Sequence, residues 1–185
     1  MMKSDDQFVE KVVEEVEKFQ GNIIRVTEQV VELPDGRTSK REVVYHSGAI
    51  AILALTDQNE MIVERQWRAP IRAVSYEVPA GKVDERDTEI IDTVNRELNE
   101  ETRLQAGKVE AVAGFYTSIG FSDEFMTLYV ATELTPVANA LPQDDDEMIE
   151  LVYWNFDKAT EMFNSGEMND AKTVMAYLYW KTLQK

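Results

Sequence analysis

The feature that most constrains the fold of this chain is a tight turn followed by an acidic segment. The turn is Val78-Pro79-Ala80-Gly81-Lys82, and Arg96-Glu97-Leu98-Asn99-Glu100-Glu101 lies downstream of it. Residues three and four apart on a helix are neighbours, so Glu97, Glu100 and Glu101 are predicted to share one helical face. Adjacent carboxylates repel one another unless positive charge lies among them. Their oxygens suit Mg2+ or Mn2+, so the sequence predicts a divalent-cation site that can hold a diphosphate.

The residues around these acids have the pattern of an amphipathic helix. A second, apolar stripe of the same helix is formed by Ile90, Ile91, Val94 and Leu98. Asp87 or Thr88 is predicted to be the N-cap, and Arg96 is predicted to pair with one of the acids. The alternative reading is an acidic face that only contacts water, which is common in chains rich in glutamate.

Composition limits the classes of function. The 185 residues suffice for one well-buried core, and 35 acidic against 19 basic residues give a net charge of −16. This charge repels nucleic acids and anionic membranes, so neither is an expected partner. Cysteine is absent, which excludes a disulfide framework and a thiolate site. No apolar run approaches the length of a membrane span and the first ten residues are polar, so a cytoplasmic location is expected.

The order of elements predicts an α+β fold. We expect an amphipathic helix at residues 5–19, because Phe8, Val12, Val16 and Phe19 recur at helical spacing. Strands are predicted at residues 23–33, 41–45, 49–55, 61–64, 109–116, 126–132 and 150–155. Helices are predicted at residues 157–164 and 171–182, the second with Asp170 as its N-cap. Strands, a central helix, more strands and terminal helices indicate a layered domain.

The turn and the acidic segment resemble the signature of the Nudix hydrolases, Gly-x5-Glu-x7-Arg-Glu-U-x-Glu-Glu-x-Gly-U, in which U is aliphatic. Other segments are similar to the ADP-ribose pyrophosphatase branch of that family, in the same order and at about the same spacing. They are Val63-Glu64-Arg65-Gln66-Trp67-Arg68, Tyr76-Glu77-Val78-Pro79-Ala80-Gly81, Ser118-Ile119-Gly120-Phe121-Ser122-Asp123-Glu124 and Asn169-Asp170-Ala171-Lys172-Thr173. The resemblance extends over roughly residues 22–180.

The resemblance implies a Nudix-like α/β/α sandwich with a mixed sheet and an N-terminal β-hairpin extension. Residues 1–45 would form an N-terminal helix and strand segment, and residues 46–185 the Nudix hydrolase domain. The resemblance to this branch also implies an intertwined homodimer, in which residues 1–45 reach the other subunit.

The resemblance also implies the chemistry. It predicts Mg2+-dependent (or Mn2+-dependent) hydrolysis of ADP-ribose to AMP and ribose 5-phosphate. The cations would be held by Glu97, Glu100, Glu101 and the backbone carbonyl of Ala80, and Glu100 would also be catalytic. The general base corresponds to an acid in the stretch 145–150, for which Glu147 is predicted, with Asp146 and Asp145 as alternatives.

Substrate contacts are predicted for two kinds of residue. Arginine binds phosphate oxygens or stacks on adenine, and carboxylate, hydroxyl and backbone groups hydrogen-bond adenine or ribose. The predicted substrate-binding residues are Arg41, Arg65, Arg68, Glu77, Gly81, Ser118 and Glu124. Ordinary ion pairing with surface acids is the alternative for Arg65 and Arg68. Trp67 is predicted to lie in the core or at a dimer interface, and His46, the only histidine, is predicted to be structural.

Three departures from the family pattern affect these expectations. The interval from Gly81 to Arg96 is one residue longer than the signature, so Glu85, Asp87 and Glu89 remain alternatives for its first acid. Arg103 replaces the closing glycine, and Ile119 replaces a proline typical of the ADP-ribose branch. The first two departures leave open a nucleotide-binding module without activity. The third leaves open another nucleotide sugar or a dinucleoside diphosphate as substrate.

Overall fold

The structure is a computed structural model that describes residues 4–82, 89–143 and 148–184. The chain divides into two compact units. The sheet unit comprises Met1–Gly48 and Tyr116–Phe125, and the sandwich unit comprises Ala49–Phe115 and Met126–Lys185. The division into domains at residue 45 stays a prediction.

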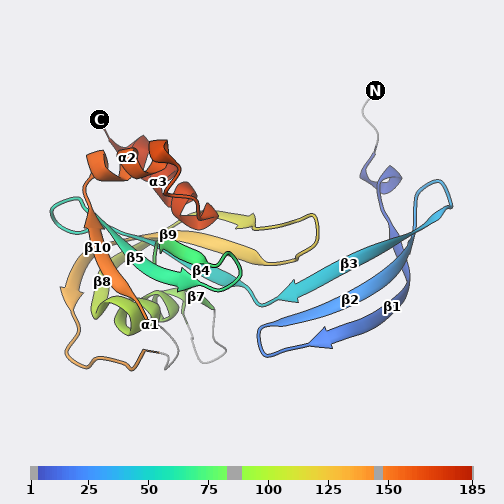
Figure 1. The fold of residues 1–185 in the computed structure, drawn as a ribbon, viewed down its shortest axis with the longest axis horizontal. Helices are drawn as coiled ribbons and strands as arrows, with labels where there is room; N and C mark the ends of the chain where they lie inside the picture. Colours follow the sequence, from blue (N-terminus) through green and yellow to red (C-terminus); the bar gives the residue numbers. More distant parts are fainter. Residues whose placement is uncertain (1–3, 83–88, 144–147, 185) are drawn as a thin grey trace. The chain divides into compact units, whose positions relative to one another are not determined.

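The sheet unit is built on an antiparallel sheet of three strands in the order β1-β2-β3 (Figure 1). A short 3-10 helix, Asp5–Gln7, precedes the strands β1 (Lys11–Gln20), β2 (Ile24–Glu32) and β3 (Thr38–His46). The turn at Pro34-Asp35-Gly36 joins β2 to β3, with Gly36 at φ 83°, a backbone conformation that glycine adopts without strain. The loop Tyr116–Phe125 attaches to β3 through Val44, whose N–H donates to the Phe121 carbonyl at 2.7 Å.

The predicted helix at residues 5–19 is wrong, because most of this segment is strand β1. Its helical spacing fits a strand because of a β-bulge between Glu17 and Phe19. Val16 lies opposite Glu28 and Phe19 lies opposite Val26, two residues apart on β2, so the bulge brings Val16 and Phe19 to one face of the sheet. Pairing with β2 and a high valine content outweigh the helical pattern.

The sandwich unit contains two sheets. One is antiparallel in the order β10-β5-β6, from Glu150–Trp154, Met61–Arg68 and Ala73–Glu77. The other is mixed in the order β7-β4-β9-β8, from Ala80–Lys82, Ala49–Ala54, Phe125–Pro136 and Leu104–Tyr116. β4 is parallel to β9 and antiparallel to β7. The predicted strands are confirmed, whereas β6 and β7 have no predicted counterpart.

Helices cover both faces of the β4 sheet, as Figure 1 shows. Alternate residues of β4 enter two separate cores: Ala51 and Leu53 pack with α2 (Phe156–Ser165) and α3 (Ala171–Leu183). Ile50 and Ile52 pack with Val94 and Leu98 of α1 (Ile90–Thr102). A strand buried on both faces explains the continuous apolar run Ala49–Leu55. The predicted α/β/α sandwich with a mixed sheet is confirmed.

The three helices are bounded by specific caps. Asp170 caps α3, since its side chain accepts a hydrogen bond from the Thr173 N–H, and Asn155 caps α2 in the same way through Lys158. The N-cap of α1 is Glu89, and the two residues predicted for that role, Asp87 and Thr88, lie outside the described residues. Among the described helices, none combines the length and the apolar character that crossing a bilayer requires.

Candidate active site

The backbone of Gly81 lies directly against the carboxylate of Glu97. A Cβ atom added to Gly81 would stand 1.9 Å from Cδ of Glu97, which no pair of atoms tolerates. Only glycine at position 81 therefore leaves the Glu97 carboxylate room to lie where it does. The turn and the acidic helix that the sequence predicts as one site do pack on each other.

Two of the three predicted carboxylates are buried beside this turn. Glu97 is 7% exposed and Glu101 is 9% exposed, and Oε2 of Glu101 accepts a hydrogen bond from the Ala80 N–H at 3.3 Å. Ionised carboxylates are costly to bury unless positive charge or hydrogen bonds compensate for the lost water. Burial at this turn therefore sets the pair apart from an acidic face that only contacts water.

Arg96 provides positive charge at the rim of the site. One guanidinium nitrogen lies 2.8 Å from Oε1 of Glu97 and 3.2 Å from Oε2 of Glu100, which confirms the predicted pairing. The other donates to the Lys82 carbonyl at 2.9 Å. Arg96 thus ties two acids of α1 to the end of β7 and fixes the orientation of both.

The helix α1 ends where the signature has glycine. Arg103 adopts φ 63° and ψ 24°, the left-handed conformation, which is strained for residues other than glycine. Its guanidinium donates to the carbonyls of Asn99, at 3.1 Å, and of Leu141. The Asn99 amide also joins this loop, donating to the Asn139 carbonyl at 2.9 Å and accepting from the Leu141 N–H at 3.0 Å. Side-chain hydrogen bonds that glycine lacks therefore offset the strain.

The donors beside the turn suit a hard divalent cation in kind. They are carboxylate oxygens, partly buried, next to a turn where Gly81 leaves room for them. Within residues 4–82, 89–143 and 148–184, no three acidic or histidine side chains already converge closely enough to hold a metal ion by themselves. A cation would need a carbonyl or phosphate oxygen as well, and would compete with Arg96 for Glu97 and Glu100.

A second charged cluster surrounds Glu77, which is 3% exposed at the end of β6. Arg68 binds its carboxylate through two hydrogen bonds of 2.7 Å, and Lys172 pairs with the same group. Burial alone would raise the pKa of Glu77, but the hydrogen bonds from Arg68 and the charge of Lys172 lower the pKa to about 2. Arg68 and Glu77, both predicted to bind substrate, thus bind each other.

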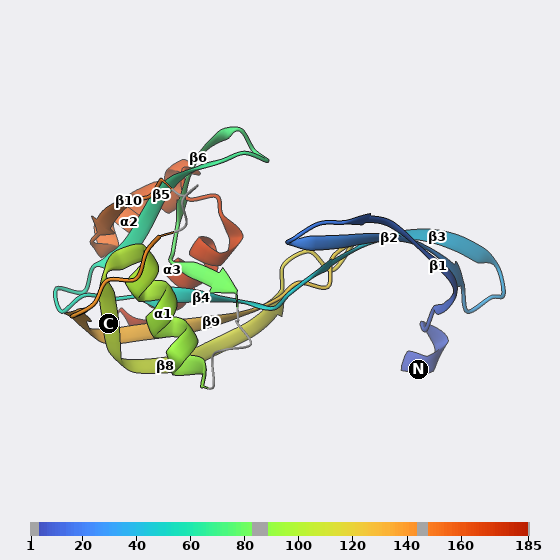
Figure 2. The ribbon, with the colours of Figure 1, turned by 90° about the horizontal axis from the view of Figure 1, so that it is seen from below.

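The hairpin of β5 and β6 carries the other predicted residues of the sandwich unit. Arg65 pairs with Glu150 at 2.7 Å, the ordinary ion pair foreseen as its alternative. Trp67 is 61% exposed, so it does not lie in the core of this chain, and its alternative place at a dimer interface stays a prediction. It lies opposite Val74, also exposed, on a hairpin that projects from its sheet in Figure 2.

The sheet unit holds Arg41, Ser118 and Glu124. Arg41 pairs with Glu10 and, together with the loop segment Ile119–Asp123, lines a hollow of about 390 Å³. The Ser118 carbonyl accepts hydrogen bonds from the N–H groups of Phe121 and Ser122, so Ser118 shapes this loop. The predicted contacts of Arg41, Ser118 and Glu124 with substrate stay predictions.

Glu124 closes the same loop. Its Oε2 accepts a hydrogen bond from the Thr117 hydroxyl at 2.6 Å, and its Oε1 lies 3.4 Å from Nδ1 of His46. Nδ1 of His46 is also 2.6 Å from the Ser47 carbonyl. The histidine is therefore engaged in local structure, as predicted.

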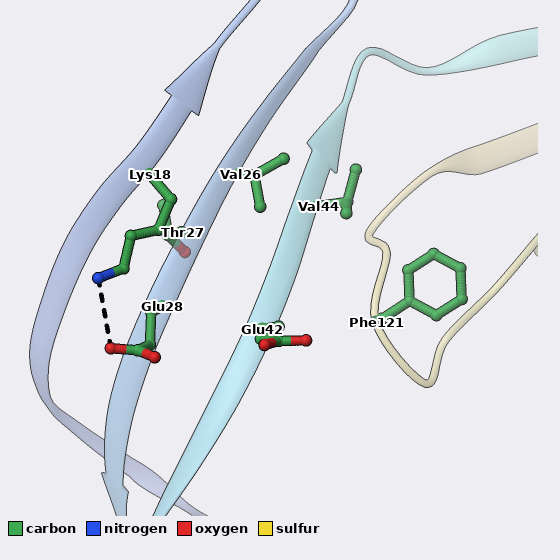
Figure 3. Close-up of a pocket in the computed structure, with 7 residues that line it drawn as sticks. All are labelled: Lys18, Val26, Thr27, Glu28, Glu42, Val44 and Phe121. Atoms are coloured by element: carbon green, nitrogen blue, oxygen red, sulfur yellow. Dashed lines mark ion pairs between the residues drawn. The ribbon is translucent and has the colours of Figure 1, made fainter.

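A second hollow in the sheet unit, of about 350 Å³, is shown in Figure 3. It has an apolar wall and an ion pair of 3.4 Å between Lys18 and Glu28. Its lining residues are Lys18, Val26, Thr27, Glu28, Glu42, Val44 and Phe121. None of the predicted site residues is among them.

Five residues with a predicted role in the site lie outside the described part of the chain. They are the base Glu147, its alternatives Asp145 and Asp146, and two of the candidates for the first signature acid, Glu85 and Asp87. The third candidate, Glu89, is the N-cap of α1, and its N–H donates to Asp92 at 3.2 Å.

Comparison with known proteins decides the family. The NUDIX domain matches residues 44–177, which include the turn before Lys82 and the helix α1. The chain belongs to the NUDIX domain family. The predicted resemblance is thereby confirmed.

Relatives of this Nudix protein extend over nearly all of its length. An ADP-ribose pyrophosphatase of Bacillus subtilis (strain 168) is 39% identical over 170 residues, 92% of this chain and 91% of that protein. A methanol dehydrogenase activator of Bacillus methanolicus is 38% identical over 172 residues, 93% and 92% of the two chains. A solved structure of an ADP compounds hydrolase has a TM-score of 0.83 at 18% identity, over 94% of this chain and 93% of that one, and supports the Nudix fold.

Sequence reasoning missed two residues of this Nudix unit that contact the turn and the Glu77 cluster. Thr173 accepts a hydrogen bond from the Val78 N–H at 2.9 Å, and Lys172 pairs with Glu77. Both follow the cap Asp170 on the first turn of α3. The cap is visible in the sequence, but contacts across 95 residues of chain are not.

Proposed function

We propose that this protein is a Mg2+-dependent hydrolase that cleaves ADP-ribose to AMP and ribose 5-phosphate. The observation that carries the proposal is the packing of Gly81 on the buried carboxylate of Glu97, which joins an oxygen-donor cluster to the turn before it. The ADP-ribose pyrophosphatase of Bacillus subtilis, at 39% identity over most of both chains, supports the substrate.

The proposed cation ligands are Glu97, Glu100, Glu101 and the carbonyl of Ala80, with Mg2+ or Mn2+ as the ion. When bound, such an ion neutralises phosphate charge and lowers the pKa of a coordinated water. The chain itself contributes the position of its carboxylates, through Arg96 and the Ala80 N–H. With a net charge of −16, the protein also needs local positive charge to accept an anionic substrate.

In the proposed reaction, a water oxygen forms a bond to one phosphorus atom of the diphosphate as the bridging P–O bond breaks. The water gives one proton to a carboxylate base, and the departing phosphate becomes the second product. We propose Glu147 as the base, with Asp146 and Asp145 as alternatives, and Glu100 as a second catalytic residue. These assignments come from the sequence resemblance.

The substrate-binding residues remain proposals: Arg41, Arg65, Arg68, Glu77, Gly81, Ser118 and Glu124. Arg41 and the loop after Ser118 line one hollow of the sheet unit, which supports a shared role. Arg68 and Glu77 bind each other, which favours a role in shaping the site over direct contact with phosphate.

A second candidate function is hydrolysis of another nucleotide sugar or of a dinucleoside diphosphate. Ile119 favours it, because this residue replaces the proline of the ADP-ribose branch and is 80% exposed on the loop that lines the hollow.

We also propose a homodimer. Every residue of β1 is exposed in the single chain, and four of them are large and apolar: Val12, Val13, Val16 and Phe19. A second copy that packs against β1 would cover these apolar side chains. Size-exclusion chromatography with light scattering measures the mass of the protein in solution, and a monomer at micromolar concentration would contradict the dimer.

The cytoplasmic location stays a prediction from the sequence.

An activity panel tests the function. The protein is incubated with Mg2+ and ADP-ribose, GDP-sugars, UDP-sugars or diadenosine diphosphate, and the nucleotide products are separated. We expect AMP and ribose 5-phosphate from ADP-ribose at the highest kcat/KM. A higher kcat/KM for another compound would support the second candidate function. Nucleotide binding without turnover of any compound would mean that the protein is a binding module without activity.

A further inference from the structure

The first turn of α3 is tied to the Val78–Ala80 backbone by one hydroxyl group. The Val78 N–H donates to Oγ1 of Thr173 at 2.9 Å, and both residues are completely buried. A buried N–H that loses its acceptor cannot turn to bulk water instead. The position of the Val78 backbone therefore depends on this hydroxyl.

Asp170 fixes the direction of the Thr173 hydroxyl. Its Oδ2 accepts the hydroxyl hydrogen at 2.7 Å and the Thr173 N–H at 3.0 Å. A hydroxyl has a single hydrogen, so donation to Asp170 leaves a lone pair for the Val78 N–H. Lys172 lies 3.2 Å from the same Oδ2 and pairs with Glu77, the residue that precedes Val78. The start of α3 thus holds two consecutive residues of the chain.

The two residues after Val78 are held by other elements. The Pro79 carbonyl accepts a hydrogen bond from the Ile52 N–H of β4 at 2.8 Å. The Ala80 N–H donates to Glu101 of α1 at 3.3 Å. Three successive residues are therefore anchored to α3, β4 and α1, and the carboxylate of Glu101 is placed relative to this backbone.

We propose that Thr173, oriented by Asp170, is a positioning residue for the cation and diphosphate site. It touches neither ligand, and it acts through the Val78–Ala80 backbone on the carbonyl of Ala80 and on Glu101. The inference rests on the proposed function, because it takes this site to be the one that binds the cation.

The proposal can be tested without turnover by measuring the affinity of the whole protein for Mn2+. Electron paramagnetic resonance detects the free ion and so gives the fraction that is bound. Thr173→Val removes the hydroxyl at nearly constant volume, and we expect about tenfold weaker Mn2+ binding, the scale for losing an outer partner of a metal site. Thr173→Ser keeps the hydroxyl and should restore binding to within about twofold of the original protein.

The matched control is Thr160→Val in α2. The Thr160 hydroxyl accepts a hydrogen bond from the Tyr177 hydroxyl at 3.0 Å and donates one to the Phe156 carbonyl at 2.8 Å. These two bonds join α2 to α3 and do not involve the Val78–Ala80 backbone. We expect a comparable loss of stability and unchanged Mn2+ affinity. Equal Mn2+ affinities in Thr173→Val and Thr160→Val would overturn the positioning role.

Asp170→Asn decides the question if Thr173→Val does not fold. Asparagine caps a helix as well as aspartate, so α3 is retained while the bond to the hydroxyl loses its charge. We expect about threefold weaker Mn2+ binding, and an unchanged affinity in this variant would reject the proposal. Failure of the proposed function is a separate result: the unaltered protein would bind Mn2+ and release no AMP from ADP-ribose.

Discussion

Glu97 occupies the space that any side chain at position 81 would need, so Gly81 and Glu97 must be considered together. The requirement for glycine here is steric, since Gly81 has no positive φ angle. The contact lets a three-residue strand lie against the C-terminal half of α1 and bring its backbone to the buried acids. This close approach is the structural basis of the proposed active site.

Replacing Gly81 with alanine should impair catalysis more than stability. The added Cβ displaces the Glu97 carboxylate, and a shift of about 1 Å in a positioned group can lower kcat/KM by about 100-fold. Gly48→Ala is the control, because a Cβ there meets only an ordinary contact of 3.6 Å. Steady-state hydrolysis of ADP-ribose checks both variants. A Gly81→Ala protein as active as Gly48→Ala would mean that the Glu97 position is unimportant.

The Glu77 cluster should make stability depend on pH below neutrality. The pKa of Glu77 in the folded protein is about 2, below its ordinary value of 4.5. Its contribution is therefore fully present above pH 4.5 and is lost as the pH falls toward 2. We expect a loss of about 2 kcal/mol over this interval, less than the full shift implies because the Arg68 side chain is 45% exposed.

Urea unfolding of Glu77→Gln between pH 2 and 6 measures this contribution. The variant should be less stable at pH 6 and should lose less stability than the original protein on acidification. Glu161→Gln, which removes an exposed ion pair with Lys158, is the control and should retain the original pH profile. Parallel pH profiles for Glu77→Gln and the original protein would show that the cluster does not hold Glu77 ionised.

Variants at Arg103 should separate backbone strain from side-chain bonding. Glycine at this position relieves about 1 kcal/mol of strain and loses the hydrogen bonds to Asn99 and Leu141, so Arg103→Gly should unfold within about 1 kcal/mol of the original protein. Arg103→Ala keeps the strain and loses the bonds. It should be about 1 kcal/mol less stable than Arg103→Gly in urea. Equal stability of the two variants would argue against a left-handed residue there.

The proposed base can be found by comparing three neighbouring acids. Glu147→Gln should lower kcat for ADP-ribose by about 100-fold, the usual scale for losing a general base, with a smaller change in KM. Asp145→Asn and Asp146→Asn serve as matched controls and should keep most of the activity. A large loss of kcat in one of these, and none in Glu147→Gln, would assign the base to that aspartate.

Much of the sandwich unit was predictable because its signals are local. Alternating or continuous apolar runs mark the strands, and the cap Asp170 and the spacing of Glu97 and Glu101 mark helices. The Nudix signature located the turn and the acids. The short strands β6 and β7 went unpredicted because five and three residues are too few to show a clear apolar pattern, and their structure comes from pairing with β5 and β4.

Other features depend on contacts that the sequence does not display. Residues 11–20 look helical until the bulges of β1 are known, and half of the predicted apolar stripe of α1, Ile90 and Ile91, is exposed. Trp67 is a large apolar residue, but its position on the hairpin of β5 and β6 leaves it exposed in the single chain. The bond from Val78 to Thr173 joins residues 95 apart, and only the packing of α3 on β6 brings them together.

Crystallography can show whether the carboxylates beside Gly81 bind a divalent cation. Crystals are soaked in MnCl2, and anomalous diffraction is collected at a wavelength sensitive to manganese. We predict a strong anomalous peak within coordination distance of Glu97, Glu101 and the Ala80 carbonyl, with Arg96 displaced from at least one of its acids. A map without a peak at this position, with Arg96 still paired to Glu97 and Glu100, would contradict the account.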